Sequence, residues 1–184
     1  PSAIHFSETP DEGIAREAGR LLGEFHFYVS DLEASAMNLC FQDFHHPWNY
    51  YRKFCETFEE AAATVKENQG LRHLASLYRK REAWLQASSG RLRDFRLSLF
   101  PCHYDPKLSN MLFDQKSRKG ICLIDLDTLA PGNMAYDFGD AVRSVCSLKR
   151  KNFSLPFFEA FFSGYVSGSR CFFSEDLLQG FWDA

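Results

Sequence analysis

The chain has 184 residues, 45% of them hydrophobic, which is enough for one well-buried domain or for one large lobe of a bigger enzyme. Its formal net charge of -3 argues against nucleic acid or an anionic membrane as the main partner, because both attract basic surfaces. The six cysteines form no CxxC pair and no zinc-ligand spacing, so we expect reduced thiols in a cytoplasmic protein.

The first half of the chain has the pattern of three helices. The first is predicted to begin at Thr9–Glu12, where a capping Thr precedes a Pro and two acidic residues near the positive end of the helix dipole. Apolar residues then recur at helical spacing. A second helix is expected over about 50–67 and a third over about 71–86, ended by the glycine-containing segments 68–70 and 88–90.

The pattern changes to short strands in the middle of the chain. Alternating apolar residues predict a strand over 95–99, and the apolar run 110–113 predicts another. The polar segment 114–120 is typical of a hairpin turn, and it leads to 121–124, which we expect to be a buried strand. The sequence therefore predicts an α+β protein that is mainly helical, with a small β-hairpin that carries the polar motifs.

Helices are expected again over 136–148, 155–164 and 174–182. The most apolar stretch, 155–166, contains Glu159 and is too short to span a membrane. No secretory signal opens the chain. We therefore expect neither a membrane nor a nucleic acid as partner.

Five polar residues stand in an order that suits phosphoryl transfer. The segment 102–110 places His103, Asp105 and Asn110 at the spacing H-x-D-x-x-x-x-N. Asp125 and Asp127 follow directly after the apolar run 121–124. Phosphoryl transfer needs such groups, because Mg²⁺ prefers carboxylate and amide oxygens and because a carboxylate can orient and deprotonate the acceptor hydroxyl. The complete ordered set is specific, whereas H-x-D alone is not.

Each of these residues has an expected role. Asp105 is predicted to be the base that deprotonates the acceptor hydroxyl. Lys107 is predicted to stabilise charge on the transferring phosphoryl group, so that it acts in catalysis and in ATP binding. Asn110 and Asp125 are predicted to bind ATP through Mg²⁺. Asp127 either binds the metal as well or orders the site.

Two further residues are expected to support this loop. His103, counted among the catalytic residues, more naturally braces the loop than transfers a proton. Asp137, within Ala135–Asp140, is expected to hold the loop backbone through hydrogen bonds. Asp140 and Arg143 lie one turn apart on a predicted helix and are interpreted as a surface ion pair, with acceptor binding as the alternative.

The stretch from His103 to Arg143 resembles the aminoglycoside phosphotransferase and choline kinase superfamily, which is protein-kinase-like. Within it, Leu123–Gly132 and Ala135–Arg143 look closest to the N-acetylhexosamine 1-kinase group, with its I-D-L-D-T-x-x-P-G and Y-D-F-G-D motifs. The segment Phe41–Phe54 is also similar to that group. The resemblance implies the C-terminal lobe of a kinase-like fold. It also implies transfer of a phosphoryl group from ATP, with Mg²⁺, to the anomeric hydroxyl of an N-acetylhexosamine.

The sequence departs from this pattern in two ways. Tyr104-Asp105-Pro106 stands where the group has Asn-Asp-Thr, so the neighbour of the predicted base is changed. Neither G-x-G-x-x-G nor a P-loop motif is present. We therefore expect residues 1–184 to be a single C-terminal catalytic lobe, inactive alone, whose N-terminal nucleotide lobe belongs to the full-length protein.

Two alternatives remain beside the amino sugar kinase. In the first, the acceptor is another small alcohol, such as choline, homoserine or an aminoglycoside. In the second, the chain is a catalytically incomplete kinase-like lobe. A choline site should offer an aromatic cage, and an aminoglycoside site should be rich in carboxylates. The acid-poor, His-bearing segment before Tyr50 favours a neutral sugar.

Overall fold

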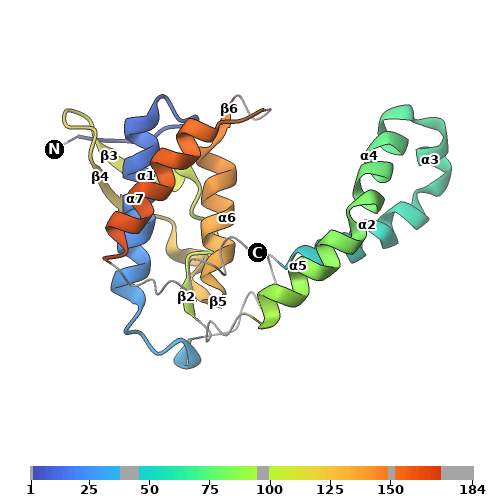
Figure 1. Ribbon diagram of the computed structural model, residues 1–184, viewed down its shortest axis with the longest axis horizontal. Coiled ribbons are helices and arrows are strands. Elements are labelled where there is room, and N and C mark those ends of the chain that lie inside the picture. Colours follow the sequence, from blue (N-terminus) through green and yellow to red (C-terminus); the bar gives the residue numbers. More distant parts are fainter. Residues whose placement is uncertain (1, 38–45, 95–99, 149–151, 171–184) are drawn as a thin grey trace. The chain divides into compact units, whose positions relative to one another are not determined.

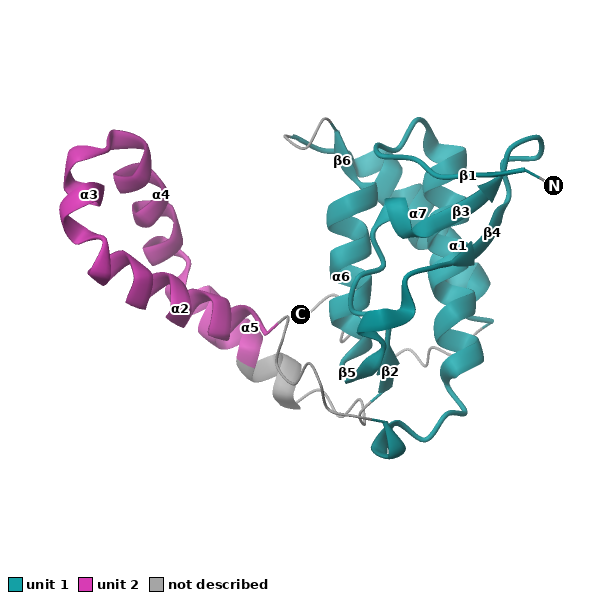
Figure 2. Ribbon diagram, turned by 180° about the vertical axis from the view of Figure 1, so that it is seen from behind, with its two compact units in different colours: residues 1–42, 97–181 teal, residues 43–96, 182–184 magenta. Residues whose placement is uncertain are grey.

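The computed structural model forms two compact units (Figure 2), one from Pro1–Gln42 and Leu97–Phe181 and the other from Asp43–Arg96 and Trp182–Ala184. The residues that it describes are 2–37, 46–94, 100–148 and 152–170. The predicted strand 95–99 and the predicted helix 174–182 lie outside these ranges. That the whole chain acts as one lobe stays a prediction.

Two helices from opposite ends of the sequence form the centre of unit 1 (Figure 1): α1, Glu12–Val29, and α7, Leu155–Gly168. Glycines let their backbones approach each other closely. A Cβ atom added at Gly19 would lie 1.9 Å from the carbonyl oxygen of Phe161, and one added at Gly164 would lie 1.9 Å from that of Arg16. No larger residue fits this crossing unless the helices move apart.

The first helix begins two residues later than the Thr9 cap predicts. The N-cap is Asp11, whose Oδ1 accepts a hydrogen bond from the Ile14 N–H at 3.1 Å. The buried Thr9 hydroxyl instead donates to the Val145 carbonyl oxygen at 2.6 Å. A tertiary contact thus takes the hydroxyl that the local pattern assigns to capping.

A three-stranded antiparallel sheet lies beside these helices in the order β1-β3-β4. Its strands are β1 (Ala3–Ile4), β3 (Met111–Asp114) and β4 (Gly120–Leu123). The predicted hairpin is therefore present, and Asp114 stabilises its turn by accepting hydrogen bonds from Ser117. The expectation of a buried second strand is wrong, because Ile121 is 48% exposed.

The remaining elements of unit 1 frame the loop between β2 and β3. Strand β2 (Phe100–Cys102) pairs antiparallel with β5 (Ala130–Gly132), and helix α6 (Met134–Val145) follows directly. Short elements complete the unit: η1 (Ala34–Ala36), η2 (Leu108–Asn110), η3 (Leu126–Thr128), β6 (Ser147–Leu148) and β7 (Asn152–Phe153). The main core joins α1, β3, α6 and α7 through Ile14, Leu22, Phe113, Val145, Phe161 and Tyr165.

Unit 2 is helical throughout its described part. Its helices are α2 (Pro47–Glu60), α3 (Ala62–Glu67), α4 (Gln69–Lys80) and α5 (Glu82–Asp94). The two long helices expected here are thus four, with breaks at Ala61 and Arg81. The predicted break at 88–90 is wrong, because those residues continue α5.

Aromatic side chains hold unit 2 together. The rings of Phe54 on α2 and Tyr78 on α4 stack with their centroids 4.6 Å apart. Trp48 stacks on the buried Tyr51 ring at 5.3 Å. None of the helices in the described ranges of either unit is long and apolar enough to cross a membrane.

The glycine crossing predicts opposite effects for two Gly→Ala changes. Gly164→Ala should lower the free energy of unfolding by roughly 1–3 kcal/mol or more, because the new methyl group meets helix backbone rather than a movable side chain. Gly139→Ala in α6 is the matched control. Its methyl group meets no atom within 4 Å, so helix propensity should raise stability by about 0.5–1 kcal/mol. Urea denaturation followed by circular dichroism measures both, and a destabilised Gly139→Ala beside an unchanged Gly164→Ala would contradict this packing.

Candidate active site

Residues 103–110, here called the site loop, connect β2 to β3 and carry most of the predicted site. The loop turns at Tyr104, whose φ of 64° is in the left-handed region. The Tyr104 side chain is 3% exposed, and its hydroxyl donates to the Pro131 carbonyl oxygen at 3.1 Å. The residue beside Asp105 that departs from the resembled pattern therefore points into the fold.

The carboxylate of Asp137, on the first turn of α6, accepts hydrogen bonds from the backbone of the site loop. Its Oδ2 accepts from the His103 N–H at 2.6 Å, and its Oδ1 accepts from the Tyr104 N–H at 2.8 Å. Asp137 is fully buried. A buried carboxylate is tolerated when charge-assisted hydrogen bonds satisfy it, so these bonds fix the loop onto α6.

Two buried residues that the sequence did not single out extend this network. His26 Nε2 on α1 lies 3.2 Å from Asp137 Oδ2, and His26 Nδ1 lies 2.7 Å from the Tyr165 hydroxyl on α7. Burial, and then the nearby Asp137 charge, hold the pKa of Tyr165 well above its ordinary value. His26 thus links the Asp137 carboxylate on α6 to the Tyr165 hydroxyl on α7.

Asp105, Lys107 and Asn110 come together in the site loop, where the Lys107 and Asp105 side chains are 40% and 30% exposed and Asn110 is buried. Lys107 Nζ lies 2.5 Å from Asp105 Oδ2. Asn110 Nδ2 donates to the same oxygen at 3.0 Å and to the Asp105 carbonyl oxygen at 2.9 Å. Asp105 Oδ1 has no hydrogen-bond partner in the part of the chain that the structure describes. One carboxylate oxygen is thus held in place, and the other is left to accept a proton.

His103 has both ring nitrogens engaged with backbone groups. Nε2 donates to the Ile124 carbonyl oxygen at 3.0 Å, and Nδ1 accepts from the Asp105 N–H at 3.4 Å. The ring is fully buried. This environment suits a brace between the site loop and the segment after β4, and it leaves neither nitrogen for proton transfer.

Asp125 and Asp127 lie on the segment that follows β4, and both are exposed. The Ile124 N–H donates to the Asn110 carbonyl oxygen at 2.9 Å, which ties this segment to the site loop. Asp125 itself has a left-handed φ of 67°. Within the described residues, no group of three or more His, Cys, Asp or Glu side chains is arranged to hold a metal ion.

The donor set nevertheless suits Mg²⁺. This ion commonly binds one or two protein carboxylates and completes its shell with water and substrate phosphates. Asn110, Asp125 and Asp127 offer an amide and two carboxylates on adjoining segments. Since Asn110 Nδ2 faces Asp105, its Oδ1 remains as the oxygen donor.

Asp140 and Arg143 form the predicted pair on α6. Arg143 Nε and Nη2 both donate to Asp140 Oδ1, at 2.9 and 2.7 Å. The Arg143 side chain is 68% exposed and that of Asp140 only 14%. The pair therefore lies at the surface, with its carboxylate turned inward.

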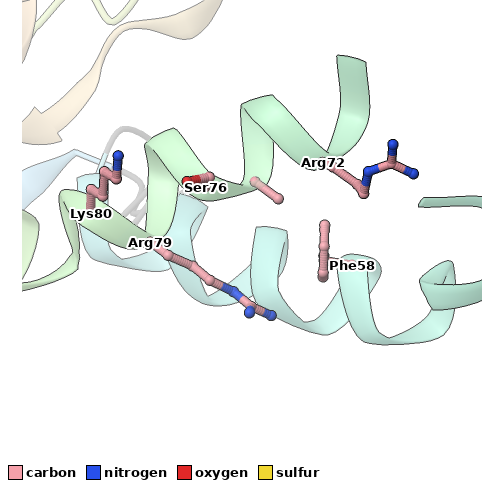
Figure 3. A pocket seen from close by; sticks show the side chains of 6 residues that line it. Phe58, Arg72, Ser76, Arg79 and Lys80 are labelled. Carbon is pink, nitrogen blue, oxygen red and sulfur yellow. The ribbon is translucent and has the colours of Figure 1, made fainter. Parts of the chain in front are cut away.

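A separate hollow of about 440 Å³ lies within unit 2 (Figure 3). Basic, aromatic and small residues line it: Phe58, Arg72, Ala75, Ser76, Arg79 and Lys80. The Arg79 guanidinium lies over the Phe58 ring, 5.0 Å from its centroid. None of these lining residues is a carboxylate and none belongs to the predicted site, so a proton acceptor for catalysis is not found among them.

Comparisons with known proteins bear on the family and the fold of the chain. A family model described as "Phosphotransferase enzyme family" matches residues 4–170. The chain is similar to an ethanolamine kinase of Plasmodium vivax, with a TM-score of 0.57 and 12% identity, over 96% of this chain and 51% of that one. It also matches a type VIII aminoglycoside-3'-phosphotransferase, with a TM-score of 0.47 and 16% identity, over 96% of this chain and 62% of that one.

The family match and the likeness to the ethanolamine kinase confirm the predicted fold class, a mainly helical α+β lobe of kinase-like type. At this identity the structural likeness concerns the fold alone. The chain spans about half to three fifths of the length of these two solved chains.

Replacing Asp137 by Asn should destabilise unit 1 and loosen the site loop. An amide keeps one acceptor oxygen but turns an NH₂ group toward a backbone N–H, so one buried donor loses its partner. The free energy of unfolding should fall by roughly 3–5 kcal/mol. Hydrogen exchange should show faster exchange at the amides of His103 and Tyr104, and an unchanged rate there would contradict the anchoring role.

Stability should also fall at alkaline pH. Burial raises the pKa of the Cys146 thiol from 9.0 to about 12, and burial followed by the Asp137 charge raises that of Cys102 well above 9.0. The unfolded chain loses these protons first, so the stabilisation is complete below about pH 9 and is lost as the pH rises toward 12.

Thiol labelling at pH 8 checks the same burial. The exposed Cys122 should react quickly, and Cys102 and Cys146 should react only on unfolding. Rapid labelling of all three in the folded protein would be the contrary result.

Proposed function

The chain belongs to the phosphotransferase enzyme family, and from this premise we propose that the full-length protein transfers a phosphoryl group from ATP, with Mg²⁺, to a hydroxyl group of a small molecule. The observation that carries the proposal is the hydrogen bonding of the two Asp105 carboxylate oxygens. One of its oxygens is held by Lys107 and Asn110, and the other is unengaged in the described part of the chain. Such a carboxylate is prepared to orient an acceptor hydroxyl and take its proton.

The proton of the acceptor passes to Asp105 Oδ1 as the hydroxyl oxygen attacks the γ-phosphorus of ATP, and the bond from that phosphorus to ADP breaks, so that ADP leaves. The Lys107 ammonium is already within 2.5 Å of Asp105 Oδ2, so it brings positive charge next to the oxygens of the transferring group. Asn110, Asp125 and Asp127 would hold Mg²⁺, which supplies charge neutralisation to the phosphate oxygens. Asp137 and His103 keep the loop in the geometry that these steps require.

The acceptor that we favour is an N-acetylhexosamine, phosphorylated at its anomeric hydroxyl. The likeness of Leu123–Gly132 and Ala135–Arg143 to the hexosamine kinase group supports this choice. The burial of Tyr104 does not oppose this choice, because the changed neighbour of Asp105 does not point outward to meet an acceptor. The alternative is another small alcohol, and the likeness to an ethanolamine kinase is consistent with an amino alcohol.

We also propose that nucleotide binding is completed by an N-terminal lobe in the full-length protein. The chain spans 51% of the ethanolamine kinase chain and carries no glycine-rich or P-loop phosphate motif. The free thiols of Cys55, Cys102, Cys122 and Cys146 suit a cytoplasmic location.

The replacement Asp105→Asn tests the proposal most directly. In the full-length protein, kcat should fall by about 10²–10⁴-fold, because an amide cannot accept the proton. The measurement is ADP release with ATP, Mg²⁺ and a panel of N-acetylhexosamines, ethanolamine, choline, homoserine and aminoglycosides.

Glu159→Gln provides the matched control for this experiment. It makes the same carboxylate-to-amide change at an exposed position of α7 and should leave kcat within about twofold of the parent protein. Thermal unfolding should show that both variants fold. An Asp105→Asn protein that folds and retains full activity would remove Asp105 as the base, and a parent protein that turns over no acceptor would favour an incomplete kinase-like lobe.

A further inference from the structure

A second hollow, of about 470 Å³, lies in unit 1 directly beside the site loop. It reaches from that loop to the C-terminal end of α6. Six residues line it, two cations and four hydroxyls: Ser7, Lys107, Ser109, Arg143, Ser144 and Ser147. No carboxylate belongs to this lining, so the chemistry of the hollow is that of a hydrogen-bond donor set.

Several of these donors are not used within the fold. The hydroxyls of Ser7 and Ser109 have no hydrogen-bond partner among the described residues. Ser144 Oγ accepts from the Leu108 N–H at 2.9 Å, which leaves its own proton to donate. Lys107 directs one of its three N–H groups to Asp105, and Arg143 Nη1 makes no hydrogen bond within the described residues. Ser147 Oγ, by contrast, already donates to the Arg143 carbonyl oxygen at 2.6 Å. An oxyanion is a ligand that the remaining donors of this lining can satisfy.

The charges around the hollow set how strongly an oxyanion binds. Lys107 is paired with Asp105, and Arg143 is paired with Asp140, so the four side chains together are neutral. An anion gains charge-assisted hydrogen bonds here without a large excess of positive charge. Binding of a small free anion should therefore be weak, as suits a group that is one part of a larger ligand.

Lys107 connects this hollow to Asp105, the predicted base. It lines the hollow, and its Nζ is 2.5 Å from Asp105 Oδ2, so an anionic group bound there lies one side chain away from the predicted base. We propose that the hollow holds a phosphate monoester or carboxylate group of the acceptor while the reacting hydroxyl of that acceptor lies at Asp105. This inference rests on the proposed phosphotransferase function and narrows the favoured N-acetylhexosamine acceptor to one that carries an anionic group, such as a sugar phosphate.

Binding to the full-length protein tests the oxyanion site without turnover. Titrations followed by NMR should use glycerol 3-phosphate, glycerate, inorganic phosphate and, as the uncharged control, glycerol. The first two should bind and glycerol should not, and their relative affinities distinguish a phosphate from a carboxylate site. Binding of inorganic phosphate alone, without glycerol 3-phosphate, would overturn a site for an attached group.

Substitutions assign any binding to this hollow. Arg143→Gln should raise the dissociation constant at least about tenfold, because it removes a charge-assisted donor. Ser7→Asp, which adds a negative charge to the lining without touching an ion pair, should weaken binding similarly. Arg79→Gln removes the same charge from the basic hollow of unit 2 and should change nothing (Figure 3). Loss of binding in Arg79→Gln, or full binding in Arg143→Gln and Ser7→Asp, would refute the assignment.

Activity measurements separate this inference from the proposed function. With matched acceptors, N-acetylglucosamine and its 6-phosphate, kcat/KM should favour the phosphorylated sugar at least about tenfold, and Arg143→Gln should abolish the preference. Turnover of neutral acceptors with no oxyanion binding would sink the inference and leave the function standing. Oxyanion binding that depends on Arg143 with no turnover of any acceptor would sink the acceptor role and the proposed function together.

Discussion

Two backbone N–H groups of the site loop, from His103 and Tyr104, end on the buried carboxylate of Asp137, and the position of Asp105 follows from those bonds. A buried carboxylate without such donors would cost several kcal/mol, so loop and helix α6 stabilise one shared arrangement. His26 contacts the same carboxylate and links it to α1. The loop geometry is therefore imposed by the body of unit 1 rather than by the loop sequence.

The glycines of α1 and α7 set the distance across which this network closes. A Cβ atom at Gly23 would lie 2.4 Å from the Tyr165 carbonyl oxygen, so the two helix backbones are in contact where His26 meets the Tyr165 hydroxyl. Larger residues would separate the helices and lengthen that 2.7 Å contact. The close packing of α1 against α7 therefore also fixes the positions of His26 and Tyr165. Rigid helices hold such polar side chains in place more accurately than a loop does.

The sequence predicted the hairpin, three helices of unit 1 that correspond to α1, α6 and α7, and the closeness of Asp105 to Asn110, because these depend on local periodicity and short spacing. The helix expected over 136–148 ends earlier, because Ser147–Leu148 form strand β6. The sequence missed three features that depend on partners distant along the chain. Thr9 matches a cap locally, but a carbonyl 136 residues away takes its hydroxyl. The apolar run around Ile121 predicts a buried strand, but Ile121 is exposed. The sequence of a strand does not show whether another element covers it. His26 and Tyr165 lie on helices without any motif, so only the fold reveals their meeting.

Tyr104 and Gly132 occupy a shared volume, since a Cβ atom at position 132 would lie 2.0 Å from the tyrosine hydroxyl oxygen. The residues at these two positions should therefore change together among related proteins. Relatives with a side chain at position 132 should carry a smaller residue at 104, and relatives that keep the tyrosine should keep the glycine. Such paired inheritance would show at which point in a lineage the side chain beside Asp105 turned inward.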